Sequence, residues 1–380
     1  MSSNSSLLVI VGMSGGVDSA VAAWLLLEQG YRVQGLFMSN WDQDDDDGYC
    51  TTAQDFQDAR RVCERLAIPL HRVSFAAEYR AQVFEHFLAE HRAGRTPNPD
   101  VLCNRQIKFG SCLAYARRLG ADRFATGHYA RIVQTPSGYR LLKGVDAAKD
   151  QSYFLHSIDP AALPVTLFPI GELTKHAVRR LARDAALPVF DKKDSTGICF
   201  IGERPFHSFL ARYLPAQPGP IESVAGEVIG AHQGLMYYTL GQRHGIGLGG
   251  VAGGPEEPWY VAAKDLERNV LVVVQGSEHA LLLSESFRIA PPHWLGAAPA
   301  VPLDCSVRVR YRQADHPCTV RRDGHGVHVI IAAPQRAITP GQSAVFYDGE
   351  ICLGGAVIEQ VLPAQPRALA RDAPSVRMPI

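Results

Sequence analysis

The chain has 380 residues, 46% of them hydrophobic and 20% charged, and its 38 basic and 38 acidic side chains give zero formal net charge. That length exceeds what one hydrophobic core usually organises, so we expect two or three domains. Composition alone gives no support to a nucleic-acid-binding surface. We see neither an apolar run long enough to cross a bilayer nor a secretory signal, so we expect a cytoplasmic protein without membrane contact.

The first half of the chain begins with an apolar run at residues 7–11, continues through Ser14-Gly15-Gly16-Val17-Asp18-Ser19, and becomes helical from residue 20. This pattern predicts a buried strand, a glycine turn and a helix whose N-terminus faces an anion such as phosphate. A Walker A loop would carry a lysine where Asp18 stands. The string SGGVDS instead resembles the PP-loop of enzymes that split ATP between its α and β phosphates.

Strand-like and helix-like segments then alternate up to about residue 186. We predict strands at 7–11, 32–38, 70–74 and 123–126, and helices at 20–29, 56–66, 79–91, 104–119 and 175–186. This alternation indicates an α/β fold with a doubly wound parallel sheet, whose ligands bind at the carboxyl ends of the strands. The glycine turn, Met38 and Gly127 follow three such ends, so we expect them to surround one nucleotide.

The second half of the chain has a different pattern of predicted elements, with short strands in place of alternating strands and helices. A hairpin is predicted at 131–142, and the proline-rich stretch 214–220 is a candidate linker. Beyond it, short strands predicted at 227–229, 236–240, 259–263 and 270–275 indicate a small central β-rich domain, and alternating strands from residue 284 indicate a C-terminal β-barrel. We therefore predict domains at 1–213, 214–283 and 284–363, with a loose tail at 364–380. Arg308, Arg310 and Arg312 alternate at period two and should project from one face of a strand.

The eight cysteines are scattered without a CxxC pair, which argues against zinc ribbons and most iron–sulfur sites, so no protein-bound metal is predicted. Cys103 follows Thr96-Pro97-Asn98-Pro99-Asp100, where Asp100 or Asn104 would cap a helix and the helix dipole would favour a thiolate. Cys199 lies in Asp194-Ser195-Thr196-Gly197-Ile198-Cys199. For each cysteine, a packing role and a reactive role both remain open from its local context.

Six strings carry a resemblance that runs in order from about Leu8 to Leu362. They are GMSGGVDSAVAAWLL, GRTPNPDVLCN, ATGHYAR, KDQSYFL, KKDSTGICFIGERPF and YYTLGQRHGIGLGG. Together they resemble the bacterial tRNA-specific 2-thiouridylase family. The resemblance implies an ATP-dependent tRNA-uridine 2-sulfurtransferase. Such an enzyme adenylates the C2 oxygen of the wobble uridine in tRNA for lysine, glutamate or glutamine, replaces that oxygen with persulfide sulfur, and releases AMP and pyrophosphate.

The same resemblance implies roles for individual residues. Cys199 would carry the persulfide, which a sulfur-donor protein loads, and Cys103 would be the second catalytic cysteine. Asp100 would orient or deprotonate the base, as well as serving as a possible helix cap. ATP, with Mg²⁺, would be bound by the glycine turn and two flanking positions, namely Gly12, Met13, Ser14, Gly15, Gly16, Val17, Asp18, Ser19, Met38 and Gly127.

For the tRNA anticodon loop, the resemblance implies contacts from Asn98, Pro99, Asp100, His128, Lys149, Asp150, Gln151, Arg310, Tyr311 and Gln342. Loop bases can be splayed out and held on their edges, which duplex bases cannot. Two alternatives are another PP-loop ATP-dependent ligase and a non-catalytic tRNA-binding protein. The first gives no use to paired cysteines, and the second gives none to a complete nucleotide loop.

Overall fold

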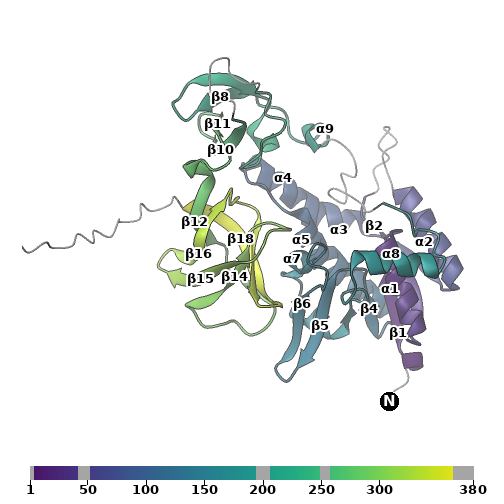
Figure 1. The fold of residues 1–380 in the computed structure, drawn as a ribbon. Helices are drawn as coiled ribbons and strands as arrows, with labels where there is room; N and C mark the ends of the chain where they lie inside the picture. The colour runs from purple at the N-terminus through teal and green to yellow at the C-terminus, as the bar shows by residue number, and fades with distance from the viewer. Residues whose placement is uncertain (1–3, 42–51, 194–205, 249–256, 363–380) are drawn as a thin grey trace, which may run out of the picture.

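The computed structural model describes residues 4–41, 52–193, 206–248 and 257–362. Within these ranges the chain forms a parallel sheet flanked by helices, a four-stranded sheet and an antiparallel barrel (Figure 1). The predicted doubly wound domain, central β-rich domain and C-terminal barrel are thereby confirmed. The boundaries at 213, 283 and 363 stay predictions, and the tail at 364–380 lies outside the described residues.

The parallel sheet has β1 (Leu8–Gly12) at its centre, and its strand order is β3-β2-β1-β4-β7. The other strands are β2 (Arg32–Ser39), β3 (Leu70–Ser74), β4 (Arg123–Ala125) and β7 (Thr166–Leu167). The apolar run of β1 is buried on both faces, as expected of a central parallel strand. The carboxyl ends of β1, β2 and β4 therefore lie side by side.

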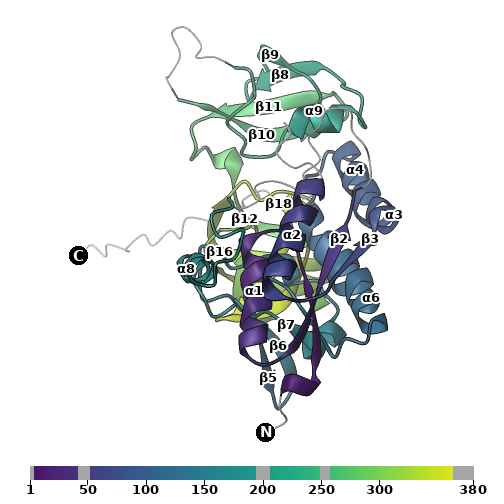
Figure 2. The ribbon, with the colours of Figure 1, turned by 90° about the vertical axis from the view of Figure 1, so that its right-hand side faces the viewer.

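Helices cover both faces of this sheet (Figure 2). One face packs Val9 and Val11 against α1 (Val17–Glu28), α2 (Thr52–Leu66) and α8 (Lys175–Asp184). The other packs Ile10 against two longer helical runs. The first run is α3 (Ala76–Tyr79), a π-helical stretch (Arg80–Phe84) and α4 (Glu85–Arg92), and the second is α5 (Pro99–Leu102), a π-helical stretch (Cys103–Cys112) and α6 (Leu113–Arg118).

The middle sheet has the strand order β10-β11-β8-β9. Its strands are β8 (Gly219–Ser223), β9 (Val228–His232), β10 (Trp259–Asp265) and β11 (Val270–Gln275), and α9 (Phe206–Ala211) precedes them. The strand predicted at 236–240 is wrong, because Leu235–Tyr237 is a short 3-10 helix. Gly234, at φ +153°, turns the chain there, and the Tyr237 N–H bonds back to the Gly234 carbonyl.

Six antiparallel strands close the barrel in the order β12-β16-β15-β14-β17-β18, with β18 pairing back onto β12. They are β12 (Leu283–Ile289), β14 (Leu303–Arg308), β15 (His316–Asp323), β16 (Gly326–Arg336), β17 (Ser343–Asp348) and β18 (Ile351–Leu362). The short strand β13 (His293–Trp294) also pairs with β18. The remaining short elements are α7 (Ser152–Leu155) and 3-10 turns at Asn4–Ser6, Pro160–Val165 and Ala280–Leu282.

The predicted hairpin forms from β5 (Ala130–Thr135) and β6 (Gly138–Lys143). Its position was not predicted: β6 pairs with β18, with Leu141 opposite Cys352 and Leu142 opposite Ile351. The hairpin leaves the parallel-sheet domain directly after β4 and extends the barrel sheet. The two domains are therefore joined by backbone hydrogen bonds as well as by side chains.

None of the described helices is long and apolar enough to span a bilayer.

Candidate active site

The loop after β1 has the geometry expected of an anion site. Gly16 begins α1 without a side-chain cap, so the first-turn N–H groups of the helix have no intrahelical acceptors. Two serines organise the turn: the Ser19 hydroxyl donates to the Gly16 carbonyl at 3.1 Å and accepts the Ser14 N–H at 3.2 Å. The Ser14 and Ser19 hydroxyls also lie 3.2 Å apart. The loop thus gathers backbone donors and two hydroxyls at the carboxyl end of the central strand.

Gly127 packs directly against this loop. A Cβ atom at Gly127 would lie 2.7 Å from the carbonyl carbon of Asp18 and 2.7 Å from the Ser19 nitrogen. Met38, near the end of the neighbouring strand β2, is half-buried. The structure therefore brings Gly127 onto the first turn of α1 and leaves Met38 at the end of the adjacent strand, as the sheet topology predicted.

Asp18, inside the loop, is held by a cation and a phenol. The Lys175 ammonium lies 2.8 and 2.9 Å from the two Asp18 carboxylate oxygens, and the Tyr129 hydroxyl donates to one of them at 2.8 Å. Lys175 is the first residue of α8, so this contact ties that helix to the loop. Sequence reasoning missed both partners, because each is more than a hundred residues from Asp18 and no local pattern marks it.

The helix that carries Cys103 begins earlier than predicted. It starts at Pro99 rather than at residue 104, and its cap is Asn98, whose side-chain oxygen accepts the Asp100 N–H at 3.2 Å. Neither Asp100 nor Asn104 is therefore the cap. Cys103 lies a full turn inside the helix, where the dipole acts more weakly than at the first turn.

Cys103 is buried, with 2% of its surface exposed, at the start of the π-helical stretch. Single π-turns inside helices are frequent at functional sites. Asn104 is equally buried, its amide nitrogen donates to the Asp100 carbonyl at 3.0 Å, and its amide oxygen has no hydrogen-bond partner among the described residues. Burial raises the pKa of the Asp100 carboxyl, although the nearby Lys108 opposes that shift. A raised pKa suits a carboxyl that exchanges a proton with a substrate.

The segment leading into this helix is fixed where three domains meet. The Thr96 N–H donates to the Pro340 carbonyl at 3.0 Å, and the Gln342 side-chain nitrogen donates to the Thr96 carbonyl at 2.8 Å. The Thr96 hydroxyl also lies 3.4 Å from that of Thr239 in the middle domain. Gln342, a predicted tRNA contact, thus holds Thr96, which lies two residues before Asn98.

His128 is buried, with 7% exposed, and lies between the rings of Phe109 and Phe168, each with its centroid 5.8 Å away. The Thr126 hydroxyl lies 2.7 Å from its Nδ1 atom. Burial, together with Lys108, places the pKa of His128 well below its usual range, so the ring is neutral. Phe109 belongs to the helix of Cys103, so this ring contact connects that helix with the Gly127–His128 segment, which packs on the loop after β1.

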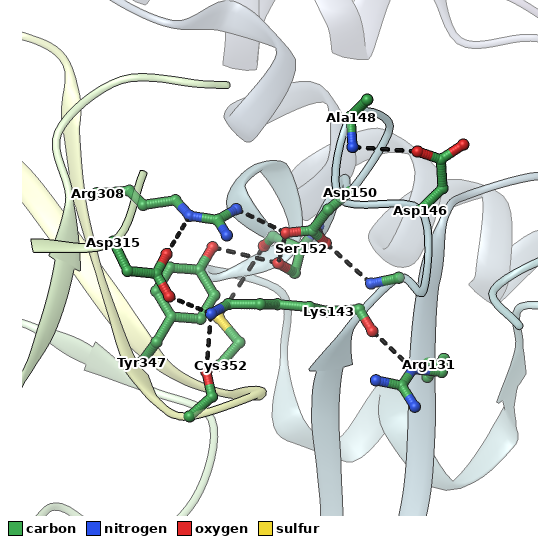
Figure 3. Close-up of polar contacts among 12 residues, drawn as sticks. Arg131, Lys143, Asp146, Ala148, Asp150, Ser152, Arg308, Asp315, Tyr347 and Cys352 are labelled. Atoms are coloured by element: carbon green, nitrogen blue, oxygen red, sulfur yellow. Dashed lines mark hydrogen bonds and ion pairs between the residues drawn. The ribbon is translucent and has the colours of Figure 1, made fainter. Parts of the chain in front are cut away.

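The predicted tRNA segment 149–151 is tied into the protein (Figure 3). Asp150 has 3% of its surface exposed, and its carboxylate accepts hydrogen bonds from the Gly144 N–H, the Ser152 N–H and hydroxyl, and the Arg308 guanidinium at 2.6 Å. The Gln151 side-chain oxygen accepts the Tyr129 N–H at 2.9 Å. The side-chain oxygens of Asp150 and Gln151 therefore hold the 149–151 segment in place through contacts within the protein.

The predicted stripe of three arginines on one strand face is wrong. Strand β14 ends at Arg308, which pairs with Asp150 and Asp315, and the chain turns at Arg312, where φ is +65°. Arg310 donates to three oxygens at 2.8 to 2.9 Å, those of Leu240, Ala337 and Thr339. The three arginines thus make different contacts, because the strand ends before the alternation can continue.

A cleft of about 440 Å³ opens between the 147–150 segment and this turn. Its lining includes Lys149, Asp150, Arg308, Tyr311, Arg312 and Gln313. The Tyr311 ring packs on Phe154 with centroids 4.4 Å apart, and the exposed Arg312 guanidinium lies 5.3 Å from the Tyr311 ring centroid. Lys149 and Tyr311 therefore share a cleft, whereas Arg310 does not line it.

Cys199, the predicted persulfide carrier, lies outside the described residues. The described chain stops at Lys193 and resumes at Phe206, whose ring packs against Phe87 and His91 with centroids 6.3 and 5.5 Å away. The pairing of Cys103 with Cys199 stays a prediction.

The sheet order and the loop after β1 define a nucleotide-binding α/β protein with two β-rich domains attached. Three family models match the chain in order: the tRNA methyl transferase HUP domain over residues 7–203, the tRNA methyl transferase PRC-barrel domain over 207–275, and the aminomethyltransferase beta-barrel domain over 284–358. The first alone covers more than half of the chain.

Curated relatives name the family. The chain is 58% identical over 356 residues to the tRNA-specific 2-thiouridylase MnmA of Stutzerimonas stutzeri (strain A1501), covering 93% of this chain and 95% of that one. It is 58% identical over 358 residues to the MnmA of Shigella boydii serotype 4 (strain Sb227), with 93% and 97% covered. The chain belongs to the tRNA-specific 2-thiouridylase family.

Among solved structures, the chain resembles a 4-thiouridine synthetase–RNA complex with bound ATP at 16% identity and a TM-score of 0.33, covering 55% of this chain and 51% of that one. A score this low supports no argument about function.

Proposed function

We propose that this protein is a tRNA-uridine 2-sulfurtransferase that uses ATP to replace the C2 oxygen of the wobble uridine in tRNA for lysine, glutamate or glutamine. The observation that carries the proposal is the 58% identity to curated 2-thiouridylases across 93% of the chain. A pyrimidine carbonyl oxygen is a poor leaving group. In the proposed reaction it attacks the α-phosphorus of ATP, pyrophosphate departs, and the oxygen later leaves as part of AMP.

The proposed nucleotide site is the loop from Gly12 to Ser19 with Met38 and Gly127. First-turn N–H groups, two hydroxyls and closely packed glycines suit a polyphosphate at this position. Mg²⁺ is ordinarily held by the phosphates and one or two carboxylates, and Asp18 is the carboxylate inside the loop. Among the described residues, no group of three or more His, Cys, Asp or Glu side chains could hold a metal ion.

Cys103 and Cys199 are the two residues proposed to carry out the sulfur transfer. In one route the Cys199 perthiolate attacks C2, AMP leaves, and Cys103 then breaks the S–S bond of the adduct. In the other, Cys103 attacks the persulfide and releases sulfide, which attacks C2. Both routes give 2-thiouridine and a Cys103–Cys199 disulfide, which a thiol reductant must reduce before the next cycle. Lys192 contacts the nucleotide loop. Cys199 follows seven residues later, a length that spans at most about 25 Å, and this limit supports the proposed role of Cys199.

The proposed RNA contacts fall into two groups. Asn98, Pro99 and Asp100 would face the target base, because they begin the helix of Cys103 and follow Thr96, which is held at the three-domain junction. Lys149 and Tyr311 would contact the anticodon stem-loop from the 440 Å³ cleft. Asp150, Gln151, His128, Arg310 and Gln342 would act mainly by shaping these surfaces, because their side chains are engaged within the protein. A cytoplasmic location and a sulfur-donor protein complete the proposal.

The test is a reconstituted reaction. The protein is incubated with ATP, Mg²⁺, a persulfide source and unmodified tRNA for lysine, glutamate or glutamine. We expect AMP, pyrophosphate and a thiolated tRNA that is retarded on a mercury-containing gel. Formation of ADP, or unchanged tRNA mobility, would contradict the proposal and favour another PP-loop ligase or a non-catalytic tRNA-binding protein.

Two variants test the cysteines. Cys103→Ser and Cys199→Ser should each abolish thiolation while leaving tRNA affinity nearly unchanged. Cys305→Ser, on barrel strand β14, is the matched control and should retain wild-type turnover. Full activity in either catalytic variant would remove that cysteine from the mechanism.

A further inference from the structure

Lys192 contacts the nucleotide loop at Gly15, whereas Gly127 packs against Asp18 and Ser19. Its ammonium group donates to the Gly15 carbonyl at 3.1 Å, to the Asp55 carboxylate at 2.7 Å and to the Asp58 carboxylate at 2.6 Å. A lysine ammonium has three protons, so these three acceptors use all of its donors. Sequence reasoning assigned none of Lys192, Asp55 and Asp58 to the nucleotide loop.

The loop is also in close contact with helix α2 at Gly15. This glycine has φ +76°, and a Cβ atom there would lie 2.3 Å from the Asp55 carbonyl oxygen. Because a trans peptide is planar, its carbonyl and the following N–H point in opposite directions. By holding the Gly15 carbonyl, Lys192 therefore fixes the direction of the Gly16 N–H, which faces the Ser14 hydroxyl at 3.4 Å.

The charges around Lys192 explain why a cation is needed here. Only 5% of the Asp58 side chain is exposed, and it also pairs with Arg61. Burial alone would raise the pKa of Asp58, but hydrogen bonds from Lys192 and Arg61 lower it overall, so the carboxylate is ionised. Two carboxylates beside an anion site would repel a polyphosphate, and the Lys192 ammonium offsets that repulsion.

We propose that Lys192 is a positioning residue of the nucleotide loop: it orients the Gly15–Gly16 peptide and neutralises Asp55 and Asp58, without itself binding phosphate. This inference rests on the proposed use of the loop for ATP. It differs from a phosphate-ligand role because all three ammonium donors are already engaged by the protein.

Equilibrium binding of α,β-methylene ATP, whose bridging carbon prevents cleavage, tests the inference without tRNA or a sulfur source. Lys192→Met should weaken binding about tenfold or more, equivalent to about 1.4 kcal/mol. The triple variant Lys192→Met, Asp55→Asn, Asp58→Asn should recover part of that loss, because the repelling charges are gone. In steady-state thiolation, Lys192→Met should raise the KM for ATP more than it lowers kcat.

Lys193→Met is the matched control, since Lys193 is the exposed neighbour and carries the same charge. It should bind the analogue like the wild type. If Lys192→Met fails to fold, Lys192→Arg replaces it: the charge remains, but the planar guanidinium cannot reproduce the three contacts, so binding should weaken less than tenfold.

Two results would overturn the inference. Unchanged analogue binding in Lys192→Met would show that the contact does not position the loop. A triple variant as weak as Lys192→Met would indicate that the ammonium binds phosphate directly. If the wild-type protein itself fails to bind the analogue, the proposed function fails, and that outcome is distinct from the other two.

Discussion

The nucleotide loop and the turn after β14 both place polar groups at a surface. The contacts that shape them differ in how far apart the contacting residues lie in the sequence. In the loop, the Ser14 and Ser19 contacts that shape the turn lie within five residues of each other. After β14, Arg308 and Arg310 bind oxygens that are as far as 158 and 70 residues away. The loop presents backbone donors, which the two serines orient locally and Lys192 orients from a distant part of the chain. The arginines instead use their charge to join distant segments.

We therefore distinguish binding groups, which are the backbone donors that the loop presents to an anion, from joining groups, which are arginines such as Arg308 and Arg310 that connect distant segments. Anion binding by a helix N-terminus needs only a short chain segment and close-packed glycines. A guanidinium that is paired with carboxylates inside the protein, as Arg308 is with Asp150 and Asp315, contributes to the shape of a surface and little to its electrostatic attraction. Positive charge in the sequence is therefore a weaker guide to RNA contact than charge that stays exposed, as it does at Arg312.

The largest effect is expected at the joining groups. Arg308→Met removes the cation from Asp150, whose side chain is 1% exposed, and leaves that carboxylate buried without its ion pair. Breaking such a pair should lower the free energy of unfolding by about 3–5 kcal/mol. Urea denaturation measures this loss. Arg312→Met is the control and should change stability by less than about 0.5 kcal/mol; a loss below about 1 kcal/mol in Arg308→Met would show that the pair is not a structural joint.

A buried lysine also connects the middle sheet with the parallel-sheet domain. The Lys264 ammonium in β10 donates to the Gly94 carbonyl, and burial lowers its pKa to about 8. Between pH 8 and the ordinary value of 10.5, the unfolded chain binds the proton more tightly than the folded protein does. Wild-type stability should therefore rise by up to about 3 kcal/mol across that window.

Lys264→Met lacks this titration, so the difference in unfolding free energy between the two proteins isolates it. His91, beside Lys264, does not interfere, because burial lowers its pKa to about 4 and it stays neutral throughout the window. Equal pH dependence of the two proteins, measured by urea denaturation from pH 7 to 10.5, would contradict the assignment.

In the nucleotide loop, Gly127→Ala should reduce kcat/KM for ATP about 100-fold, because the new methyl group meets backbone atoms of α1 at 2.7 Å and displaces the loop. Gly324→Ala is the matched control: it adds the same atom where no other atom lies within 4 Å. Steady-state kinetics at saturating tRNA compare the two. A wild-type kcat/KM in Gly127→Ala would mean that the loop accommodates the methyl group.

The smallest effect concerns the exposed arginine. If Arg312 contacts a phosphate from the cleft, Arg312→Met should reduce the slope of log Kd for tRNA against log salt by about one. Arg310→Met, which removes an internally bonded guanidinium, should leave that slope nearly unchanged. A reduced slope in Arg310→Met with an unchanged slope in Arg312→Met would instead indicate that Arg310 contacts the RNA.

Much of the α/β fold follows from the sequence because its elements are marked locally. Apolar runs, glycine turns and helical periodicity predicted β1, α1 and the strands on either side. The start of the Cys103 helix was misplaced by five residues, because Pro99 at the first helical position is also a common turn residue. Its cap, Asn98, follows the usual preference for asparagine before a proline-initiated helix.

The site was predictable only in part. The strand–loop–helix geometry around Gly15 and Ser19 was expected, but the Lys192 and Lys175 contacts were not, since each joins residues more than a hundred positions apart. The arginine alternation failed for a related reason. Period-two spacing predicts one face only while a strand continues, and β14 ends at Arg308.

The pairing of β6 with β18 has a consequence for how the molecule can be divided. Any fragment that begins after the parallel-sheet domain would lack β6 and so would open the edge of β18 at Ile351 and Cys352, while β17 would still pair on the other side. Such edges invite pairing with a second chain. An isolated barrel should therefore tend to self-associate. In the whole protein this edge is covered by β6, which belongs to the parallel-sheet domain and lies some two hundred residues earlier in the chain.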